Sequence, residues 1–206
     1  MPEAAPIVYV VDDDEAVRDS LALLFESEGL DARAFASADE VLDKLERERP
    51  GCIVADVRMP GMSGVELLET LKAQHAAIPI ILITGHGDVP MAVAALKAGA
   101  ADFFEKPFDE ALLVSSVRAA LDRTHEERRR VVEDEELRAR LASLTARERE
   151  VMDLIVAGHS NKMVAARLAI SPRTVEVYRA RVMEKMQARS LADVVRMAIR
   201  LDGADT

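Results

Sequence analysis

Residues 52–64 constrain the fold of this chain more than any other stretch. Cys52 to Ala55 are small or apolar and predict a buried strand, which runs directly into Asp56 and then into a turn rich in Pro and Gly. Ser63 and Glu66 have the spacing of a capping box, which predicts the start of a helix. The stretch is therefore a strand, an acidic tip, a loop and a helix, as in an open α/β sheet, where sites lie at the carboxyl ends of the strands.

Four further strands are predicted before residue 122. Residues 7–11 form an apolar run that ends in the acidic segment Asp12–Glu15, and the other strands are expected at residues 31–35, 80–83 and 102–105. Helical periodicity and capping signals predict helices at residues 15–28, 37–46, 63–74 and 89–98, with another from residue 110. Strands that alternate with helices predict an α/β unit built on a doubly wound, five-stranded parallel sheet.

The predicted strand ends carry groups that can share one site. A parallel sheet would bring together the carboxylates of residues 12–15 and Asp56, the hydroxyl of Thr84 and the ammonium of Lys106. At an effective dielectric of about 20, two carboxylates ~4 Å apart repel by roughly 4 kcal/mol, so a bare cluster would take up protons or a cation. Mg²⁺ suits such a set best, because it needs few protein oxygens and also accepts phosphate oxygens.

These polar residues resemble the site of the receiver domain of two-component response regulators, over about residues 1–122. The positions that agree in type, order and context are Asp12, Asp13, Asp56, Thr84 and Lys106–Pro107. The resemblance implies that Asp56 accepts a phosphoryl group from a sensor histidine kinase. It also implies that Asp12, Asp13 and Asp56 hold Mg²⁺ together with the backbone carbonyl of Arg58.

The same resemblance assigns roles in switching. Thr84 and Lys106 would contact the phosphoryl oxygens, and Phe103 would swing inward on activation. The face formed by helix 89–98 would then change shape. Val93 and Lys97, on one turn of that helix, are therefore candidates for a homodimer contact made on phosphorylation.

Charge divides the chain into two parts. The net charge of −10 combines −13 on residues 1–141 with +3 on residues 142–206, which indicates two domains with different partners. Residues 123–142 are dense in both acidic and basic residues and lack a sustained apolar heptad, so they predict a solvated helical linker. A coiled-coil dimer stalk is the alternative for this segment.

Residues 143–206 predict an all-α, helix-turn-helix domain. A capping box at Thr145 and Glu148 starts a helix that ends near Gly158, a short helix follows at residues 161–169, and a longer one is expected at residues 172–187. The segment resembles the LuxR-type DNA-binding domain over about residues 143–201, at Leu144–Thr145, Gly158, Asn161–Lys162, Ala165, Leu168, Ile170–Ser171, Arg173–Val175 and Lys185–Met186. The resemblance implies sequence-specific binding to double-stranded DNA.

The helix at residues 172–187 is expected to read the DNA. On a helical wheel Val175, Val182 and Met186 share a buried face. The expected partners of that face are Leu154, Ile155 and Leu168. The opposite face is expected to meet the major groove and the phosphates through Arg173, Thr174, Glu176, Val177, Ala180 and Arg181. Glu176 stands where similar domains more commonly have a basic residue; it either accepts from a cytosine amino group or weakens binding by repelling phosphate.

A net charge of +3 is modest for a DNA-binding domain. It predicts few phosphate contacts and weak binding by one copy, so two copies would be needed. The last predicted helix, residues 190–201, carries a broad apolar face. Part of that face is expected to cover the domain core, and the rest is a candidate for pairing two DNA-bound copies.

Both halves together resemble response regulators of the FixJ type. The resemblance implies a cytoplasmic transcription activator that is phosphorylated on Asp56, dimerises, binds DNA and works with RNA polymerase. It implies a phosphoryl acceptor rather than an enzyme, with slow self-dephosphorylation at most, and control of nitrogen-fixation genes under low oxygen. A single Cys52, no signal-peptide pattern and no long apolar segment fit the cytoplasm and exclude a membrane partner.

Three other interpretations account for parts of the sequence less well. Gly85–Asp88 lacks the third glycine and the basic residue of a nucleotide-binding loop, so a flexible loop that lets Thr84 move is the better interpretation. A Mg²⁺-dependent phosphatase with Asp56 as nucleophile would carry an acid where Arg58 stands. A constitutive DNA-binding protein with a degenerate receiver would not need the intact acidic set.

Overall fold

The computed structural model describes residues 5–46, 49–85 and 89–204, with side chains for all of these except residues 89 and 202–204. Residues 86–88 of the predicted loop at 85–88 therefore lie outside the described residues. Internal contacts divide the chain into two units, Met1–Arg128 and Arg129–Thr206, and each unit is described by itself. Within the described ranges, no helix is both long and apolar enough to cross a membrane.

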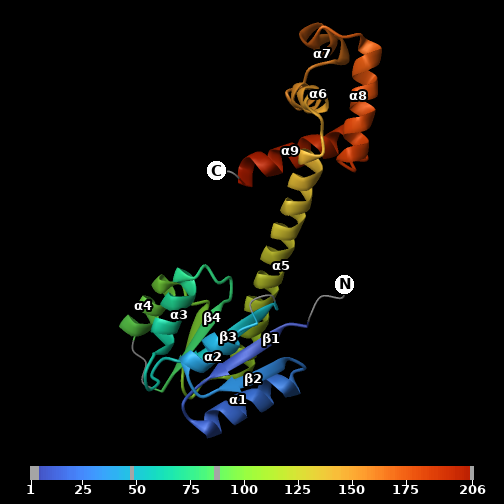
Figure 1. Ribbon diagram of the computed structural model, residues 1–206. Coiled ribbons are helices and arrows are strands. Elements are labelled where there is room, and N and C mark those ends of the chain that lie inside the picture. Colours follow the sequence, from blue (N-terminus) through green and yellow to red (C-terminus); the bar gives the residue numbers. More distant parts are fainter. Residues whose placement is uncertain (1–4, 47–48, 86–88, 205–206) are drawn as a thin grey trace. The chain divides into compact units, whose positions relative to one another are not determined.

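The first unit is built on a five-stranded parallel sheet (Figure 1). Its strands are β1 (Ile7–Val11), β2 (Asp31–Phe35), β3 (Gly51–Asp56), β4 (Ile80–Thr84) and β5 (Asp102–Glu105). The strand order is β2-β1-β3-β4-β5, so the direction of winding reverses between β1 and β3. The predicted doubly wound α/β sheet is confirmed, and the carboxyl ends of β1 and β3, beside this reversal, are where open α/β sheets generally bind ligands.

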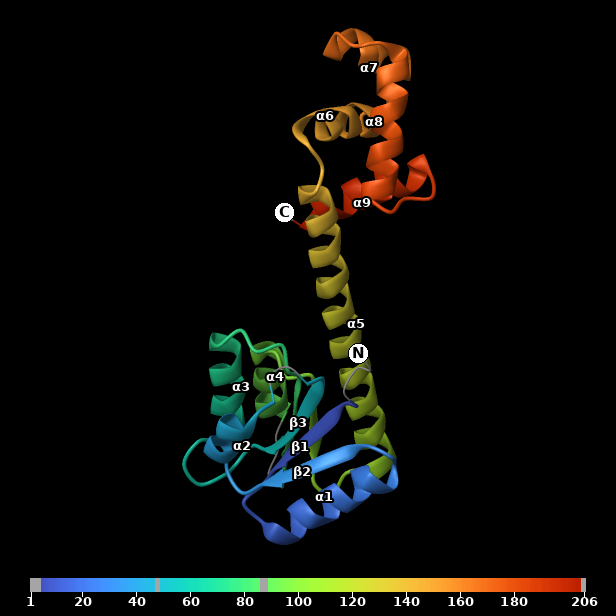
Figure 2. The ribbon, with the colours of Figure 1, turned by 45° about the vertical axis from the view of Figure 1, so that its right-hand side comes forward.

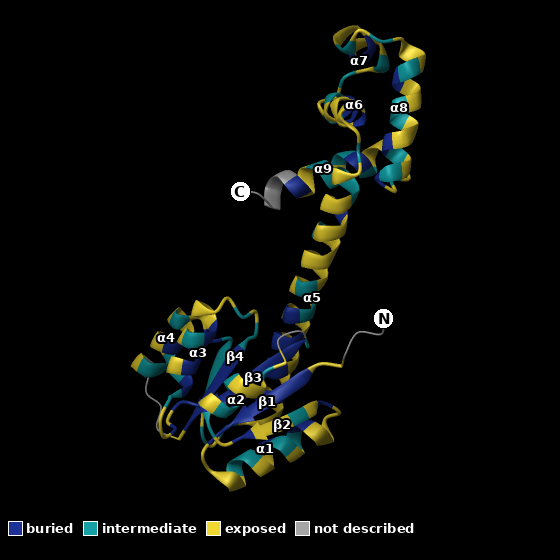
Figure 3. Cartoon of the chain, viewed as in Figure 1, coloured by how far each residue is buried: buried dark blue, intermediate teal, exposed yellow. Residues whose placement is uncertain are grey.

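Five helices of the first unit cover both faces of the sheet (Figures 1 and 2). They are α1 (Glu15–Ser27), α2 (Ala38–Lys44), α3 (Gly64–Ala73), α4 (Val89–Ala98) and the first part of α5 (Glu110–Ala142). Apolar residues of α2, α3 and α4 share one buried cluster, and those of α1 and α5 share the other. Figure 3 shows β1 and β3 buried between these layers, as expected for strands covered on both faces.

The second unit contains the predicted helix-turn-helix. Its helices after α5 are α6 (Ala146–Val156), α7 (Asn161–Leu168), α8 (Pro172–Lys185) and α9 (Leu191–Ala204). Thr145 and Glu148 form the predicted capping box of α6, and Ser171 caps α8 with Pro172 at its first position. Local hydrogen-bonding signals in the sequence therefore locate the starts of these helices to within a residue or two.

The core of the second unit differs in part from the prediction. Val175 packs near Leu154, Ile155 and Leu168, as expected. Val182 and Met186 instead belong to a separate cluster formed with Leu137, Met152, Val194 and Leu201. The difference arises because α8 is long enough to meet two sets of helices along its length.

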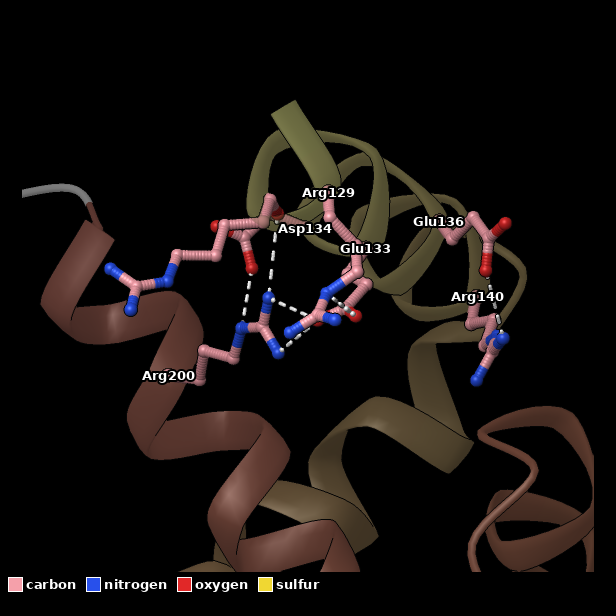
Figure 4. Close-up of polar contacts among 7 residues, drawn as sticks. Arg129, Glu133, Asp134, Glu136, Arg140 and Arg200 are labelled. Carbon is pink, nitrogen blue, oxygen red and sulfur yellow. Dashed lines mark hydrogen bonds and ion pairs between the residues drawn. The ribbon is translucent and has the colours of Figure 1, made fainter. Parts of the chain in front are cut away.

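The second half of the expected linker is packed rather than fully solvated. Leu137 of α5 is 6% exposed within the second unit. Arg200 of α9 reaches the same part of α5: Nε donates to Asp134 Oδ1 at 2.6 Å, and the guanidinium lies 3.0 Å from Glu133 Oε2 (Figure 4). Residues 129–142 thus pack with α9.

Candidate functional site

Four strand ends of the sheet meet at one edge of the first unit. Asp12 directly follows β1, Asp56 and Thr84 are the last residues of β3 and β4, and Lys106 directly follows β5. The register of the parallel strands places these ends side by side, with Asp56 beside Ile83 and Thr84 beside Glu105. Neighbouring parallel strands therefore gather the residues that the sequence singled out.

Lys106 joins two acidic residues that lie far apart in the sequence. Its Nζ donates to Asp12 Oδ2 at 2.7 Å and to Asp56 Oδ1 at 2.8 Å. Asp12 is 2% exposed and Asp56 is 7% exposed, so both carboxylates have lost most of their contact with water. Burial by itself would lower the pKa of Lys106, but its hydrogen bonds to Asp12 and Asp56 outweigh this effect and raise the pKa. The side chain is therefore an ammonium ion shared by two carboxylates.

Close backbone contacts set the orientation of Asp56. Its second oxygen, Oδ2, accepts a hydrogen bond from the backbone N–H of Arg58 at 2.6 Å. Gly64 lies so near that a Cβ atom there would come within 2.4 Å of the Asp56 carbonyl oxygen, so only glycine fits. One oxygen of Asp56 is thus held by the following loop while the other faces Lys106.

Thr84 ends β4, which pairs with the strand of Asp56, and Phe103 lies on β5, the strand beyond β4. Thr84 is 1% exposed, and its backbone carbonyl accepts a hydrogen bond from the backbone N–H of Lys106 at 2.7 Å. Phe103 is half-buried, pairs with Leu82 in the sheet and packs on the cluster under α2, α3 and α4. The backbone of Lys106 is thus bound to that of Thr84, and Phe103 lies on β5, the strand that Lys106 directly follows.

The oxygen donors at this edge suit a small, hard cation. The Asp12 and Asp56 carboxylates already share one positive charge, and carboxylate and carbonyl oxygens are the ligands that Mg²⁺ prefers. Asp13 is exposed, and within the described residues no group of three His, Cys, Asp or Glu side chains could hold a metal ion as it stands. The donor chemistry fits Mg²⁺, while Lys106 is the cation that the structure shows.

Sequence reasoning missed one residue beside this site. Arg18, on α1, donates from Nη1 to the backbone carbonyl of Asp12 at 2.7 Å. No motif or hydrophobic period marks this contact. A basic residue a few positions after an acidic run, on the first turns of the following helix, is the only signal that the sequence contains.

The surface expected to read DNA is exposed on α8. Arg173, Glu176, Val177, Ala180 and Arg181 are exposed, whereas Thr174 is half-buried and its hydroxyl lies 2.8 Å from that of the capping Ser171. Arg179 donates to Asn161 Oδ1 at 2.6 Å and so connects α8 to α7. The predicted residues therefore lie on one face of α8, and the hydrogen bond of Arg179 holds this helix to α7.

The two residues expected to form a dimer contact are accessible. Val93 is 44% exposed and Lys97 is exposed, both on α4. Leu96, between them in the sequence, is 48% exposed. An exposed apolar side chain beside a lysine suits contact with another surface, although single exposed apolar residues are common on proteins.

The fold and the acidic edge together define a class: a receiver-type α/β unit followed by a helix-turn-helix unit. Comparison with known families agrees with this assignment. Residues 8–118 match the response regulator receiver domain, and residues 142–198 match the luxR family of bacterial regulatory proteins. The two matches cover the two units in the order that the sequence predicted.

Known relatives align with nearly the whole chain, and so with both units. The transcriptional regulatory protein FixJ of Azorhizobium caulinodans is 54% identical over 97% of this chain and 94% of its own length. The response regulator protein TodT of Pseudomonas putida is 44% identical over 98% of this chain and 88% of its own length. The structure of response regulator StyR has a TM-score of 0.86 at 43% identity and covers 96% of this chain and all of its own. The chain belongs to the FixJ-type response regulator transcription factors.

Proposed function

We propose that Asp56 accepts a phosphoryl group from a sensor histidine kinase and that this modification controls how the second unit binds DNA. One observation carries the proposal: a half-buried, charged Lys106 shared between the buried Asp12 and Asp56 at 2.7 and 2.8 Å. A buried carboxylate with a positive charge at hand is a suitable nucleophile, because the charge that it gains has a partner already in place.

The transfer balances as a displacement at phosphorus. An Asp56 oxygen forms the new O–P bond, the N–P bond of the kinase phosphohistidine breaks, and the bonding electrons return to the departing imidazole. The product carries roughly 1.5 to 2 negative charges. Lys106 is then drawn away from Asp12 towards the phosphoryl oxygens, Thr84 contributes its hydroxyl, and Phe103 moves inward into the space released.

Asp12, Asp13 and Asp56, with the backbone carbonyl of Arg58, are the residues that would hold Mg²⁺. The bound ion would supply positive charge that neutralises the phosphoryl oxygens. Two buried carboxylates that share one ammonium support this assignment, since they gather negative charge that needs a second cation once Lys106 turns to the phosphoryl group. Self-dephosphorylation would be slow, so the modified state would persist long enough to signal.

The output would be transcription activation from a homodimer. Val93 and Lys97 would form the new contact on α4, and the exposed side chains of α8 would read double-stranded DNA so that RNA polymerase is engaged. Working boundaries are residues 1–122 for the receiver, 123–142 for the linker and 143–206 for the DNA-binding domain. Similarity to FixJ supports control of nitrogen-fixation genes under low oxygen in the bacterial cytoplasm.

Asp56→Asn tests the proposal, because asparagine keeps the size of the side chain but removes the nucleophilic oxygen anion. Incubation with acetyl phosphate and Mg²⁺ should add one phosphoryl group to the wild type and none to the variant, as measured by intact-mass spectrometry. Light scattering should show a dimer for the phosphorylated wild type and a monomer for Asp56→Asn. Asp19→Asn, an exposed change on α1, is the matched control and should behave as wild type.

Two results would contradict the proposal. A phosphoryl group that appears on Asp56→Asn protein would place the acceptor elsewhere. Equal affinity of the wild type for operator DNA before and after treatment with phosphoryl donor would mean that the receiver does not control DNA binding.

A further inference from the structure

Arg18 holds the main chain of the acidic loop rather than its carboxylates. Its Nη1 lies 2.7 Å from the carbonyl oxygen of Asp12, a residue that precedes the N-cap of α1, Asp14. The contact therefore closes the loop onto the body of the helix, and it adds nothing to the hydrogen bonding within α1. A guanidinium bound to a nearly buried carbonyl is a charge-assisted hydrogen bond, which is stronger than a neutral one.

The remaining contacts of Asp12 differ in how they would respond to phosphorylation. Oδ1 accepts from the backbone N–H of Asp14 at 3.0 Å, and the backbone N–H donates to Phe35 at 3.2 Å. Oδ2 is held by Lys106 at 2.7 Å. If Lys106 turns to a phosphoryl group on Asp56, this last contact is lost, whereas the carbonyl bound by Arg18 is unaffected.

We propose that Arg18 is a positioning residue, which keeps the carboxylate of Asp12 beside Asp56 and Lys106 so that it can take a divalent cation. The inference rests on the proposed function. The carboxylates of neighbouring acidic residues in a loop repel one another, and Asp12–Glu15 is such a run of acidic residues. Arg18, a cation on α1, offsets part of this repulsion. Removal of a residue that orients a metal ligand through a hydrogen bond typically changes metal affinity by about 10- to 100-fold.

The chain offers a matched control for Arg18→Met. Arg118, on α5, also donates to a backbone carbonyl at 2.7 Å, that of Glu28 just after the opposite end of α1. Arg118→Met therefore removes a backbone contact of the same kind, together with an ion pair to the Glu28 carboxylate at 3.1 Å, in the same unit and away from the acidic edge. Both substitutions keep an unbranched side chain of similar length.

Calorimetric titration of the full chain with Mg²⁺, without phosphoryl donor, is the first measurement. Arg18→Met should bind Mg²⁺ about tenfold more weakly than wild type, and Arg118→Met should match wild type. In phosphorylation by acetyl phosphate, the Mg²⁺ concentration for half-maximal rate should rise by about tenfold in Arg18→Met while the rate at saturating Mg²⁺ stays within about twofold of wild type. If Arg18 only stabilised the fold, its removal would not raise the Mg²⁺ requirement while leaving the rate at saturating Mg²⁺ nearly unchanged.

Arg18→Gln provides a second variant, since it retains an N–H donor without the charge and should lie between wild type and Arg18→Met. Equal Mg²⁺ affinity of wild type and both Arg18 variants would overturn the assignment, as would an equal loss in Arg118→Met. Either result leaves the proposed function intact if wild-type Asp56 is phosphorylated. Wild-type protein that neither binds Mg²⁺ nor takes up a phosphoryl group would overturn both proposals.

Discussion

At the scale of a single residue, Glu148 takes part both in a local capping box and in a contact with a residue far along the sequence. Its carboxylate accepts from the backbone N–H of Thr145 at 2.8 Å, as a capping box requires, but also from Lys185 Nζ at 2.6 Å. Lys185 also donates to the carbonyl of Ser143 at 3.0 Å, so these hydrogen bonds connect the start of α6 to the end of α8. The hydrogen bond from Lys185, with that from Thr145, lowers the pKa of Glu148 to about 2.

This pKa predicts how acid affects the second unit. Glu148 has an ordinary pKa of 4.5 when unfolded, so the unfolded chain takes up the proton first. The stability that its ionised form contributes is complete above pH 4.5 and is lost as the pH falls to about 2. Thermal unfolding followed by circular dichroism should therefore show Glu148→Gln less stable than wild type near pH 6, with the difference shrinking towards pH 2.

Glu150→Gln, an exposed change on the same helix, is the control and should track wild type throughout this range. A stability difference between Glu148→Gln and wild type that is constant with pH would show that ionisation of Glu148 does not support the fold.

At the scale of elements, the helix α5 contributes apolar residues to the buried clusters of both units. Leu113, Val117 and Leu121 pack under the sheet of the first unit, whereas Leu137 is buried among α6, α8 and α9 in the second. Charge density alone predicts a solvated helix for residues 123–142, because most of their side chains are charged. Leu137, the half-buried Leu141 and the ion pairs of Arg200 pack the last part of the helix.

Arg200→Met should loosen residues 129–142 without unfolding the unit. Ion pairs that are this exposed are each worth about 1 kcal/mol or less, so amide hydrogen exchange in this segment should accelerate by about two- to fivefold. Arg196→Met is the control, since Arg196 forms an ion pair with Asp193 on its own helix. Identical exchange in both variants would mean that Arg200 does not hold α5 and α9 together.

At the scale of the whole molecule, charge and exposed surface predict that two copies act together. The second domain has a net charge of only +3, so one copy would make few phosphate contacts and bind DNA weakly. Two copies on one site would join two such weak interactions, and the affinity would rise without any new base contact. Under the proposed function, control of dimerisation is the simplest way for the receiver to control DNA binding.

Val93→Glu tests this coupling, because it places a carboxylate on the exposed face of α4 without disturbing the core. The variant should still be phosphorylated on Asp56, as read by mass spectrometry, yet remain a monomer in light scattering and lose most of the donor-dependent gain in operator affinity. Leu23→Glu, on the exposed side of α1, should dimerise normally. A phosphorylated Val93→Glu dimer would exclude α4 as the contact.

The sequence by itself determined the elements and their order. Apolar runs, capping boxes and turns are local signals, because each depends on residues within a few positions, and they predicted every strand and helix of both units to within a few residues. The acidic strand ends followed from the same patterns, since parallel strands end at one edge. Local patterns alone therefore predicted that Asp12, Asp56, Thr84 and Lys106 lie together at that edge.

Only the tertiary structure decided which side chains pair. Lys106 and Asp12 are 94 positions apart, and no periodicity links them. The contacts of Arg18 with the Asp12 carbonyl and of Arg200 with Glu133, the burial of Leu137 and the exposure of Asp13 also depend on how the helices pack. Local hydrogen bonding and hydrophobic period specify a backbone element, but a long side chain finds its partner only when packing brings distant parts of the chain within reach.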